Sequence, residues 1–283
     1  MAKHAFKKFE RSKTPPKFRI GSDEVRLLEL LADYRFLDTR QILALRKDLS
    51  ERTIKRKLQY LYQAGFIDRP KQQFLYFKAS NYLVYSIAKR GANLLSQEKG
   101  IHIKTAKAKE IGASFLKHAL MISEFRACLT AALDKAGAKL AVWRDLGPID
   151  AAAVGGVRQP IAPDAFFTIG DRGDVIHFFL EADRSTMTTK RVLLKLKAYL
   201  EWWRQGRQKQ LLGISNFRVI TLTISDDRKD NLRIAGQQIG DSGQGSSLFW
   251  FGCQNSFTLE NPSSILQPIW QTSKDEVLHK ILE

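Results

Sequence analysis

Residues 161–186 read IAPDAFFTIGDRGDVIHFFLEADRST and carry the strongest fold signal in the chain. Two apolar runs, at 165–169 and 175–181, flank a short turn that holds two glycines. Apolar runs of this length with a glycine-containing turn between them predict two strands joined as a hairpin. A hairpin places the start of its first strand beside the end of its second. We therefore expect the side chains of Asp164 and Glu181 to lie close together.

Three carboxylates gather at this end of the predicted hairpin. Asp183 follows Glu181 by two residues, so on a regular strand both side chains point to the same face. Carboxylate oxygens suit Mg²⁺ or Mn²⁺, and such a metal polarises a phosphoryl oxygen and activates a water. Asp164, Glu181 and Asp183 are therefore candidate metal ligands and, in an active site, candidate catalytic residues. The alternative is that Asp164 simply starts a strand and that Glu181 and Asp183 form structural ion pairs with Arg184 or Lys195.

A long amphipathic helix is predicted at 188–204, after the hairpin. Val192, Leu196, Tyr199 and Trp203 share one stripe of this helix, and Lys195 lies at the edge of the stripe. Lys195 is the one lysine of the helix expected to reach toward the sheet, which makes it a candidate catalytic residue. The alternative is a surface lysine whose stem is buried and whose charge stays in water.

Strands and helices alternate through the rest of this region. Further strands are predicted at 140–143 and 218–224, and a helix at 111–136 ends at Gly137. This alternation predicts an α+β or α/β domain with a mixed sheet over residues 111–283.

The first part of the chain has a different pattern, in which three short helices precede short strands. The predicted elements are helices that begin near Ser22, at Asp38 or Thr39 and at 51–63, strands at 66–67, 75–77 and 82–85, and a helix at 88–95. Three helices followed by a two-stranded wing is the order of a winged helix-turn-helix DNA-binding domain, which fills residues 22–97. We expect residues 1–21 to be a flexible basic arm and 98–110 to be a linker.

The helix at 51–63 is the candidate DNA-reading helix. Ile54, Leu58 and Leu61 form its core-facing stripe, which leaves a basic face outward. In a helix-turn-helix, the N-terminal half of the second helix enters the major groove, where Arg recognises guanine. The predicted DNA-binding residues are Arg52, Thr53, Lys55, Arg56, Lys57 and Tyr60 on the helix, Arg69 and Lys71 in the wing, and Lys7 and Lys8 in the arm. The alternative is a solvated basic helix that binds protein, or nothing.

The charge distribution favours a polyanionic partner. The chain of 283 residues has a formal net charge of +17. Residues 1–110 hold 25 Lys and Arg against 11 Asp and Glu, whereas residues 111–283 hold 21 against 18. A basic segment of this kind is typical of proteins that bind nucleic acid. Double-stranded DNA is therefore the expected partner.

The composition argues against several other classes of protein. With 44% hydrophobic and 27% charged residues, the chain resembles an ordinary globular protein. No stretch approaches the ~20 apolar residues that a membrane helix needs, and the basic N-terminus lacks the apolar core of a secretory signal. Two cysteines argue against a disulfide scaffold and a four-cysteine zinc site. We expect a cytoplasmic, nucleoid-associated bacterial protein with no membrane partner.

The elements Pro163-Asp164 and Glu181-x-Asp183 resemble the signature of the PD-(D/E)XK nuclease-like fold. The resemblance implies a restriction-endonuclease-like mixed-sheet domain, and it adds Glu124 on the preceding helix as a further metal ligand. The chain departs from the signature at Asp183, where that fold has a lysine. The lysine orients the attacking water and offsets negative charge in the transition state, and an aspartate does neither. Asp183 therefore favours a binding protein over an enzyme.

The whole arrangement also resembles the replication-relaxation family of plasmid and mobile-element proteins, over about residues 22–225. The matching positions are the winged domain with YSIAKRG at 85–91, the helix that bears His118, Pro163-Asp164, Glu181-Ala182-Asp183-Arg184, and Lys195 with Tyr199. This resemblance implies a DNA-binding protein of a plasmid or an integrated element.

We therefore expect a sequence-specific or structure-specific double-stranded DNA-binding protein that acts in transcriptional regulation or in DNA replication and transfer. Its nuclease-like domain is expected to be degenerate, and DNA binding to need no cofactor. A homodimer and mobile-element partner proteins are further expected partners. Two alternatives stay open. One is a metal-dependent DNA endonuclease or nickase that uses Mg²⁺ or Mn²⁺, and the other is a non-enzymatic adaptor that recruits a partner protein to DNA.

Overall fold

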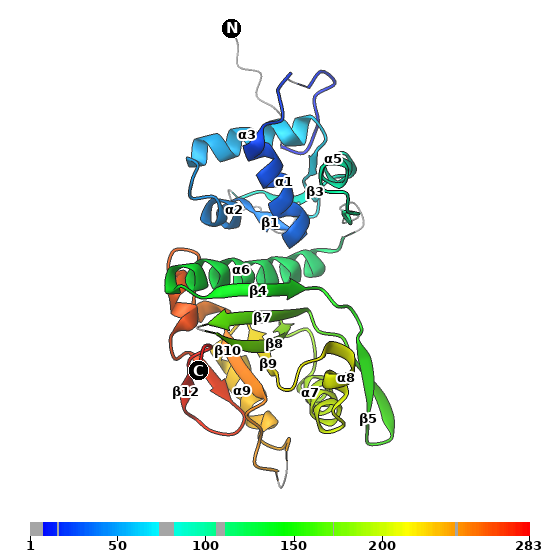
Figure 1. The fold of residues 1–283 in the computed structure, drawn as a ribbon, viewed down its shortest axis with the longest axis vertical. Helices are drawn as coiled ribbons and strands as arrows, with labels where there is room; N and C mark the ends of the chain where they lie inside the picture. Colours follow the sequence, from blue (N-terminus) through cyan, green and yellow to red (C-terminus); the bar gives the residue numbers. More distant parts are fainter. Residues whose placement is uncertain (1–7, 16, 74–81, 106–110, 172, 241–242) are drawn as a thin grey trace. The chain divides into compact units, whose positions relative to one another are not determined.

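The computed structural model describes residues 8–15, 17–73, 82–105, 111–171, 173–240 and 243–283. Contacts within the chain divide it into two compact units, residues 1–127 and 128–283. The division falls inside the long helix α6 (Ala113–Ala136), which begins in the first unit and ends in the second. Figure 1 shows the helices and strands of both units, and each unit is described by itself below.

The first unit contains a small antiparallel sheet and the helices that surround it. Its elements are α1 (Ser22–Tyr34), β1 (Leu37–Asp38), α2 (Thr39–Leu45), α3 (Glu51–Gln63), β2 (Ile67–Asp68), β3 (Val84–Ile87), α5 (Lys89–Lys99) and the first part of α6. Strand β3 lies in the middle of the sheet, between β1 and β2. The strand predicted at 75–77 lies outside the described residues.

Side-chain caps fix where α2 and α3 begin. Asp38 accepts a hydrogen bond from the backbone N–H of Gln41 at 3.0 Å, and the Gln41 side chain accepts one from the Asp38 N–H at 3.0 Å. Ser50 caps α3 by accepting from the backbone N–H of Thr53 at 3.3 Å. After α3, Gly65 adopts a φ of 77°, which stops the helix. The two helices are therefore short, separate and joined by a turn.

The helices of the first unit each bury one face. The shared core is formed by Leu27, Leu28 and Leu31 of α1, Ile42 of α2, Ile54, Leu58 and Leu61 of α3, and Ile67 and Ile87 of the sheet. Helix α5 approaches the turn after α3 so closely that a Cβ atom on Gly91 would lie 2.3 Å from the Phe66 carbonyl oxygen. Only glycine fits at that position without moving the backbone.

The described part of the predicted basic arm packs against α3 and β2 of the first unit. Arg11 donates to the carbonyl oxygen of Tyr62 at 2.9 Å and forms an ion pair with Asp68 at 2.6 Å. The Ser12 N–H donates to the side chain of Gln63 at 2.6 Å. The carbonyl and carboxylate oxygens around the end of α3 thus supply partners for the arm that its own sequence does not reveal.

The second unit is built on a mixed sheet of seven strands, which confirms the predicted α+β class. The strands are β4 (Lys139–Arg144), β7 (Ala165–Asp171), β8 (Asp174–Asp183), β9 (Arg218–Thr223), β10 (Phe249–Cys253), β11 (Trp270–Thr272) and β12 (Leu278–His279). Their order across the sheet is β12-β11-β10-β9-β8-β7-β4. Strands β8, β9 and β10 are parallel neighbours, and the remaining neighbours are antiparallel.

Helices connect the parallel strands, as parallel pairing requires. Helices α7 (Thr189–Arg204) and α8 (Arg207–Leu212) lead from β8 to β9, and α9 (Asp226–Gly236) leads from β9 to β10. Strands β5 (Asp150–Val154) and β6 (Val157–Ile161) form a separate hairpin that lies against α7 (Figure 1). Two short 3-10 helices, Gln254–Ser256 and Pro262–Leu266, precede β11.

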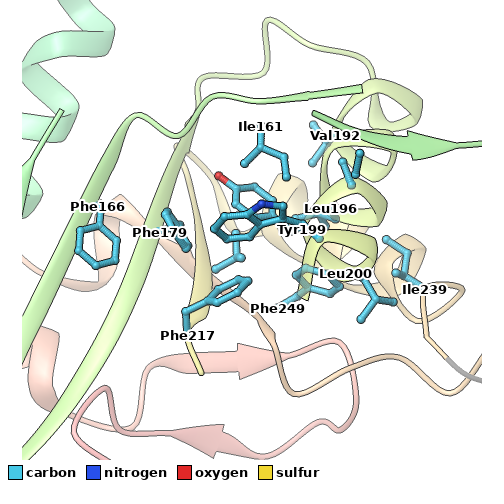
Figure 2. Close-up of a cluster of buried hydrophobic side chains, with 14 of the residues drawn as sticks. Ile161, Phe166, Phe179, Val192, Leu196, Tyr199, Leu200, Phe217, Ile239 and Phe249 are labelled. Carbon is cyan, nitrogen blue, oxygen red and sulfur yellow. The ribbon is translucent and has the colours of Figure 1, made fainter. Parts of the chain in front are cut away.

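Aromatic packing fixes how α7 lies on the sheet. Figure 2 shows Tyr199 of α7 among apolar side chains that include Phe179 and Phe217. The rings of Phe179 and Phe217 have centroids 4.9 Å apart, and those of Phe179 and Tyr199 are 5.5 Å apart. The indole of Trp202, one turn along, donates to Asp150 at 2.8 Å and so ties the β5–β6 hairpin to the helix. These contacts hold one face of α7 toward β8.

None of the described helices combines the length and the apolar content needed to cross a membrane.

Candidate functional site

Strands β7 and β8 bring the predicted carboxylates to one end of the sheet. Ala165 pairs with Leu180, and one residue further out the Asp164 N–H donates to the Leu180 carbonyl oxygen at 3.0 Å. The Asp164 carboxylate accepts from the Ala182 N–H at 2.8 Å. Asp164 thus extends the β7–β8 ladder and lies next to the residues that surround Glu181.

Glu181 is held by two side chains of α7. Glu181 is 6% exposed, and its Oε1 accepts a hydrogen bond from the Tyr199 hydroxyl at 2.6 Å. Its Oε2 forms an ion pair with the Nζ of Lys195. Lys195 and Tyr199 are four residues apart, so they lie one turn apart on the same helix face. Lys195, the helix lysine expected to reach toward the sheet, therefore contacts Glu181.

Burial shifts the protonation equilibria of this group. Burial raises the pKa of Glu181 to about 7, a shift that the positive charge of Lys195 opposes and that the negative charge of Asp164 increases. Burial and the neighbouring Glu181 carboxylate raise the pKa of the Tyr199 hydroxyl well above its ordinary value. Tyr199 therefore remains a hydrogen-bond donor to Glu181 over the whole physiological range.

Asp183 has a different cation for a partner. Asp183 is 2% exposed. Its carboxylate forms a 2.6 Å ion pair with the Nε of Arg228, which lies at the start of α9. The same guanidinium donates to the hydroxyl of Thr189 at 3.1 Å and to the carbonyl oxygen of Met187 at 2.8 Å. Arg184, the cation considered from the sequence, has no ion pair in the part of the chain that the structure describes. Asp183 therefore ties α9 to the end of β8.

The space beside these carboxylates is small. A cavity of about 10 Å³, at the lower limit for one water molecule, is lined by residues that include Glu181, Asp183, Lys195 and Thr221. The hydroxyl of Thr221, which sits opposite Glu181 on β9, is buried and has no hydrogen-bond partner among the described residues. A nucleic acid or a nucleotide does not fit in this cavity.

The predicted metal ligands on β8 are engaged by other side chains of the described chain. No group of three or more His, Cys, Asp or Glu side chains within the described ranges is placed to hold a metal ion. Glu181 is engaged by Lys195 and Tyr199, and Asp183 is engaged by Arg228, so the oxygens that a metal would need already have partners. Glu124 lies on the part of α6 within the first unit and pairs with Arg40 at 3.4 Å.

The cations of α3 fall into two groups. Arg52 and Arg56 are exposed and form no ion pair with any described residue. Lys55 pairs with Glu51 at 2.5 Å across the helix surface, and Lys57 pairs with Glu24 of α1 at 2.6 Å. Of the six predicted DNA-binding residues on this helix, the two arginines therefore carry the uncompensated charge. Thr53 accepts from the capping hydroxyl of Ser50 at 2.9 Å, and Tyr60 packs against Phe18 with 5.8 Å between ring centroids.

The predicted wing and arm residues are placed differently from one another. Arg69 is only 6% exposed, donates to the Lys8 carbonyl oxygen at 2.7 Å and lies 4.1 Å from the ring centroid of Tyr62. It therefore holds the arm in place and is not presented to solvent. Lys8 and Lys71 have exposed side chains. Lys7 lies outside the described residues.

Sequence reasoning missed three features of the second unit. The hydrogen bond between Tyr199 and Glu181 has a signal in hindsight, because Tyr199 follows Lys195 by four residues. Arg228 has no such signal, since the acidic start of α9 does not show that this one arginine turns back toward β8. The buried Thr221 hydroxyl likewise follows only from the parallel pairing of β8 with β9.

The first unit is a small helix-and-sheet domain with a basic helix, α3, on its surface. The second unit is a mixed-sheet α+β domain in which Asp164, Glu181 and Asp183 form a closed carboxylate cluster. The chain belongs to the replication-relaxation family, whose profile matches residues 28–216 and so covers more than half of it. No curated protein and no solved structure matches the chain.

Proposed function

We propose that this protein binds double-stranded DNA and acts in the replication or transfer of a plasmid or mobile element. In this proposal the first unit is a winged helix-turn-helix that contacts DNA. The second unit is a nuclease-like domain that does not cleave DNA. Membership of the replication-relaxation family supports the role in replication or transfer. The element order helix, strand, helix, helix, strand, strand in the first unit supports the winged helix.

The observation that carries DNA binding is the pair of arginines on α3. Arg52 and Arg56 lie on the N-terminal half of the second helix of the pair α2–α3, four residues apart and both exposed. Neither has an acidic partner among the described residues, so their charge is available to an anion. The N-terminal half of this helix is the part that enters the major groove in helix-turn-helix proteins, and Arg forms paired hydrogen bonds with guanine there.

The closed carboxylate cluster supports binding without cleavage. A metal-dependent nuclease needs carboxylate oxygens free to coordinate the metal and space for the scissile phosphate. Glu181 and Asp183 are paired with Lys195 and Arg228, and the cavity beside them is at the lower limit for one water molecule. In this proposal the protein's own cations, rather than a metal, offset the charge of these carboxylates, so no step of a cleavage reaction is assigned to this cluster.

The test is binding of the full chain to a fluorescent random-sequence duplex, followed by fluorescence anisotropy over a range of salt concentrations. Affinity should fall steeply with salt, by a log–log slope of about −0.9 for each phosphate contact. In the same assay with a duplex selected for tight binding to the parent chain, Arg52→Ala and Arg56→Ala should each weaken binding by roughly 1–3 kcal/mol and relax base preference. Arg144→Ala, an exposed arginine of β4, is the matched control and should bind like the parent chain. Equal affinities for all four proteins would overturn the proposal.

The rival function is a metal-dependent endonuclease, favoured by the convergence of Asp164 and Glu181 at one end of the sheet. A supercoiled plasmid incubated with the protein and Mn²⁺ distinguishes the two functions. We expect no cleavage above that of a Glu181→Gln preparation. Cleavage that disappears in both Asp164→Asn and Glu181→Gln would establish the endonuclease instead.

A further inference from the structure

The second unit has its own concentration of positive charge, away from the carboxylate cluster. Residues 184–218 contain nine Lys and Arg and a single acidic residue, Glu201. This segment forms α7, α8 and the start of β9. The remainder of the second unit is therefore acidic, and the near-neutral total for residues 111–283 conceals one strongly basic region.

Three of these cations form a row on the outer face of α7. Lys190, Lys197 and Arg204 are spaced by seven residues, so they lie almost in line along the helix, with about 10 Å between successive members. All three are exposed, on the side opposite the buried Tyr199. Lys190 and Lys197 have no acidic partner in the described part of the chain, whereas Arg204 pairs with Glu201.

Two hollows open at the C-terminal end of α7. The first, the lysine-side hollow, has a volume of about 300 Å³ and lies between α7, the β5–β6 hairpin and residues 238–240. Lys197, Arg204 and Glu201, the ion-pair partner of Arg204, line it, and Leu200 and Ile239, both labelled in Figure 2, form its apolar floor.

The second, the tryptophan-side hollow, has a volume of about 210 Å³ and is lined by Trp203, Asn216, Phe217, Arg218 and residues 246–248. Trp203 is 40% exposed, unlike its fully buried neighbour Trp202. Asn216 is also exposed and carries both hydrogen-bond donors and an acceptor. An indole face and an amide beside the buried ring of Phe217 suit a flat heteroaromatic ring with polar edges.

We propose that the outer face of α7 and the two hollows at its end bind single-stranded nucleic acid. The lysine row follows the phosphates, and an unstacked base occupies the tryptophan-side hollow against Trp203. Proteins bind single strands without strong sequence preference by combining a path of cations, which follows the phosphates, with exposed aromatic faces on which bases stack. A duplex does not satisfy this site, because the faces of its bases are covered by stacking. The inference is separate from duplex binding by the first unit.

The test is anisotropy of a fluorescent oligo(dT) 15-mer with the full chain, in parallel with the duplex assay and with oligo(rU) of the same length. Lys190→Ala/Lys197→Ala should weaken oligo(dT) binding about tenfold and reduce the log–log salt slope by about 1.4, since each single-strand phosphate contact contributes about 0.7. The matched control is Lys135→Ala/Lys139→Ala, which removes two exposed lysines of the second unit elsewhere and should behave like the parent chain. The ratio of the oligo(dT) and oligo(rU) affinities shows whether the site serves DNA or RNA.

The stacking contact has a separate signature. Trp203→Ala should weaken oligo(dT) binding roughly tenfold and leave the salt slope unchanged, and Trp203→Phe should retain most of the affinity. Quenching of tryptophan fluorescence on oligo(dT) addition should be lost in Trp203→Phe, because the other tryptophans are more buried. The thermal unfolding midpoint of each variant shows whether it is folded.

Three outcomes decide the inference. Loss of oligo(dT) binding only in the α7 variants supports it. Equal loss in Arg52→Ala/Arg56→Ala, with the α7 variants unchanged, would place single strands on the first unit and overturn it. Absence of oligo(dT) binding by the parent chain at about 10 μM also overturns it, while normal duplex binding in that experiment would leave the proposed function standing. Oligo(dT) binding without duplex binding would leave this inference standing and contradict the proposed function.

Discussion

The two units use the same kinds of cation in opposite ways. On α3, Arg52 and Arg56 are exposed and have no acidic partner among the described residues. At the end of β8, Lys195 and Arg228 are mostly buried and each neutralises a buried carboxylate. The number of basic residues is therefore a poor guide to a binding surface, because the partners of each cation decide whether its charge reaches a ligand.

The physical reason for the difference lies in the acidic residues. A buried carboxylate without a cation costs several kcal/mol, so Glu181 and Asp183 require Lys195 and Arg228. On α3 the only acidic residue is Glu51, which is placed to compensate Lys55 alone. If this comparison is correct, replacing a paired cation changes stability, and replacing an unpaired cation changes DNA binding.

The largest expected effect is on the Asp183–Arg228 pair. Arg228→Met leaves Asp183 buried without a cation and should lower the free energy of unfolding of the second unit by about 3–5 kcal/mol. Urea unfolding followed by tryptophan fluorescence measures this unit alone, because all five tryptophans lie within it.

Two variants control this experiment. Arg52→Met should leave the tryptophan transition within about 0.5 kcal/mol of the parent, since it removes an exposed side chain of the other unit. Asp183→Asn/Arg228→Met should recover part of the loss, because no buried charge then remains. An Arg228→Met protein as stable as the parent would break the comparison between the two units.

The pH dependence of stability gives the next largest effect. The raised pKa of Glu181 means that the folded protein holds a proton more tightly than the unfolded chain, whose Glu titrates near pH 4.5. Stability should therefore be highest below about pH 4.5 for this group and fall as pH rises to about 7, by on the order of 3 kcal/mol. Urea unfolding of the parent and of Glu181→Gln at pH 5 and pH 7.5 isolates this contribution. Identical pH dependence in both proteins would contradict it.

A smaller effect is expected from the tyrosine that holds Glu181. Tyr199→Phe removes a 2.6 Å hydrogen bond to a carboxylate and leaves the ring packing in place. The second unit should lose about 2 kcal/mol, within the range for hydrogen bonds to charged groups. The loss should be greater at pH 7.5 than at pH 5, because the ionised carboxylate needs the hydroxyl more. A loss that is independent of pH would mean that Tyr199 contributes through packing alone.

Much of the fold follows from local sequence signals. The helix predicted at 51–63 occurs with those limits, because Ser50 caps its start and Gly65 stops it shortly after its end. The strands predicted at 165–169 and 175–181 occur as β7 and β8, each slightly longer than predicted. Caps, glycine turns and apolar periodicity are local properties, and the sequence displays them directly.

The features that the sequence did not predict depend on long-range contacts. Strands β5 and β6 were missed because their run of small and polar residues lacks the apolar alternation of a strand, and Asp150 anchors the hairpin through Trp202, 52 residues away. The pairing of Asp183 with Arg228 spans 45 residues. For the same reason the sequence predicts Arg69 as a DNA-binding residue of the wing, although Lys8 and Tyr62 enclose it.

The smallest expected effect concerns Thr221. Its buried hydroxyl tests whether the cluster of Asp164, Glu181 and Asp183 is a closed structural site or a site that binds a ligand. Its hydroxyl is buried opposite Glu181 and lacks a hydrogen-bond partner among the described residues. Valine has the same shape without the hydroxyl, so Thr221→Val removes an unsatisfied polar group and should change the free energy of unfolding by less than about 1 kcal/mol, in the stabilising direction. Urea unfolding by tryptophan fluorescence detects the change, and Thr168→Val, which removes a hydroxyl bonded to His177 at 3.0 Å, is the matched control that should be destabilised. If Thr221→Val is destabilised as much as the control, the Thr221 hydroxyl has a partner in solution and the cluster is more open than its ion pairs indicate. If it is not, the end of β8 is a closed structural centre, and the second unit must meet its ligands elsewhere on its surface.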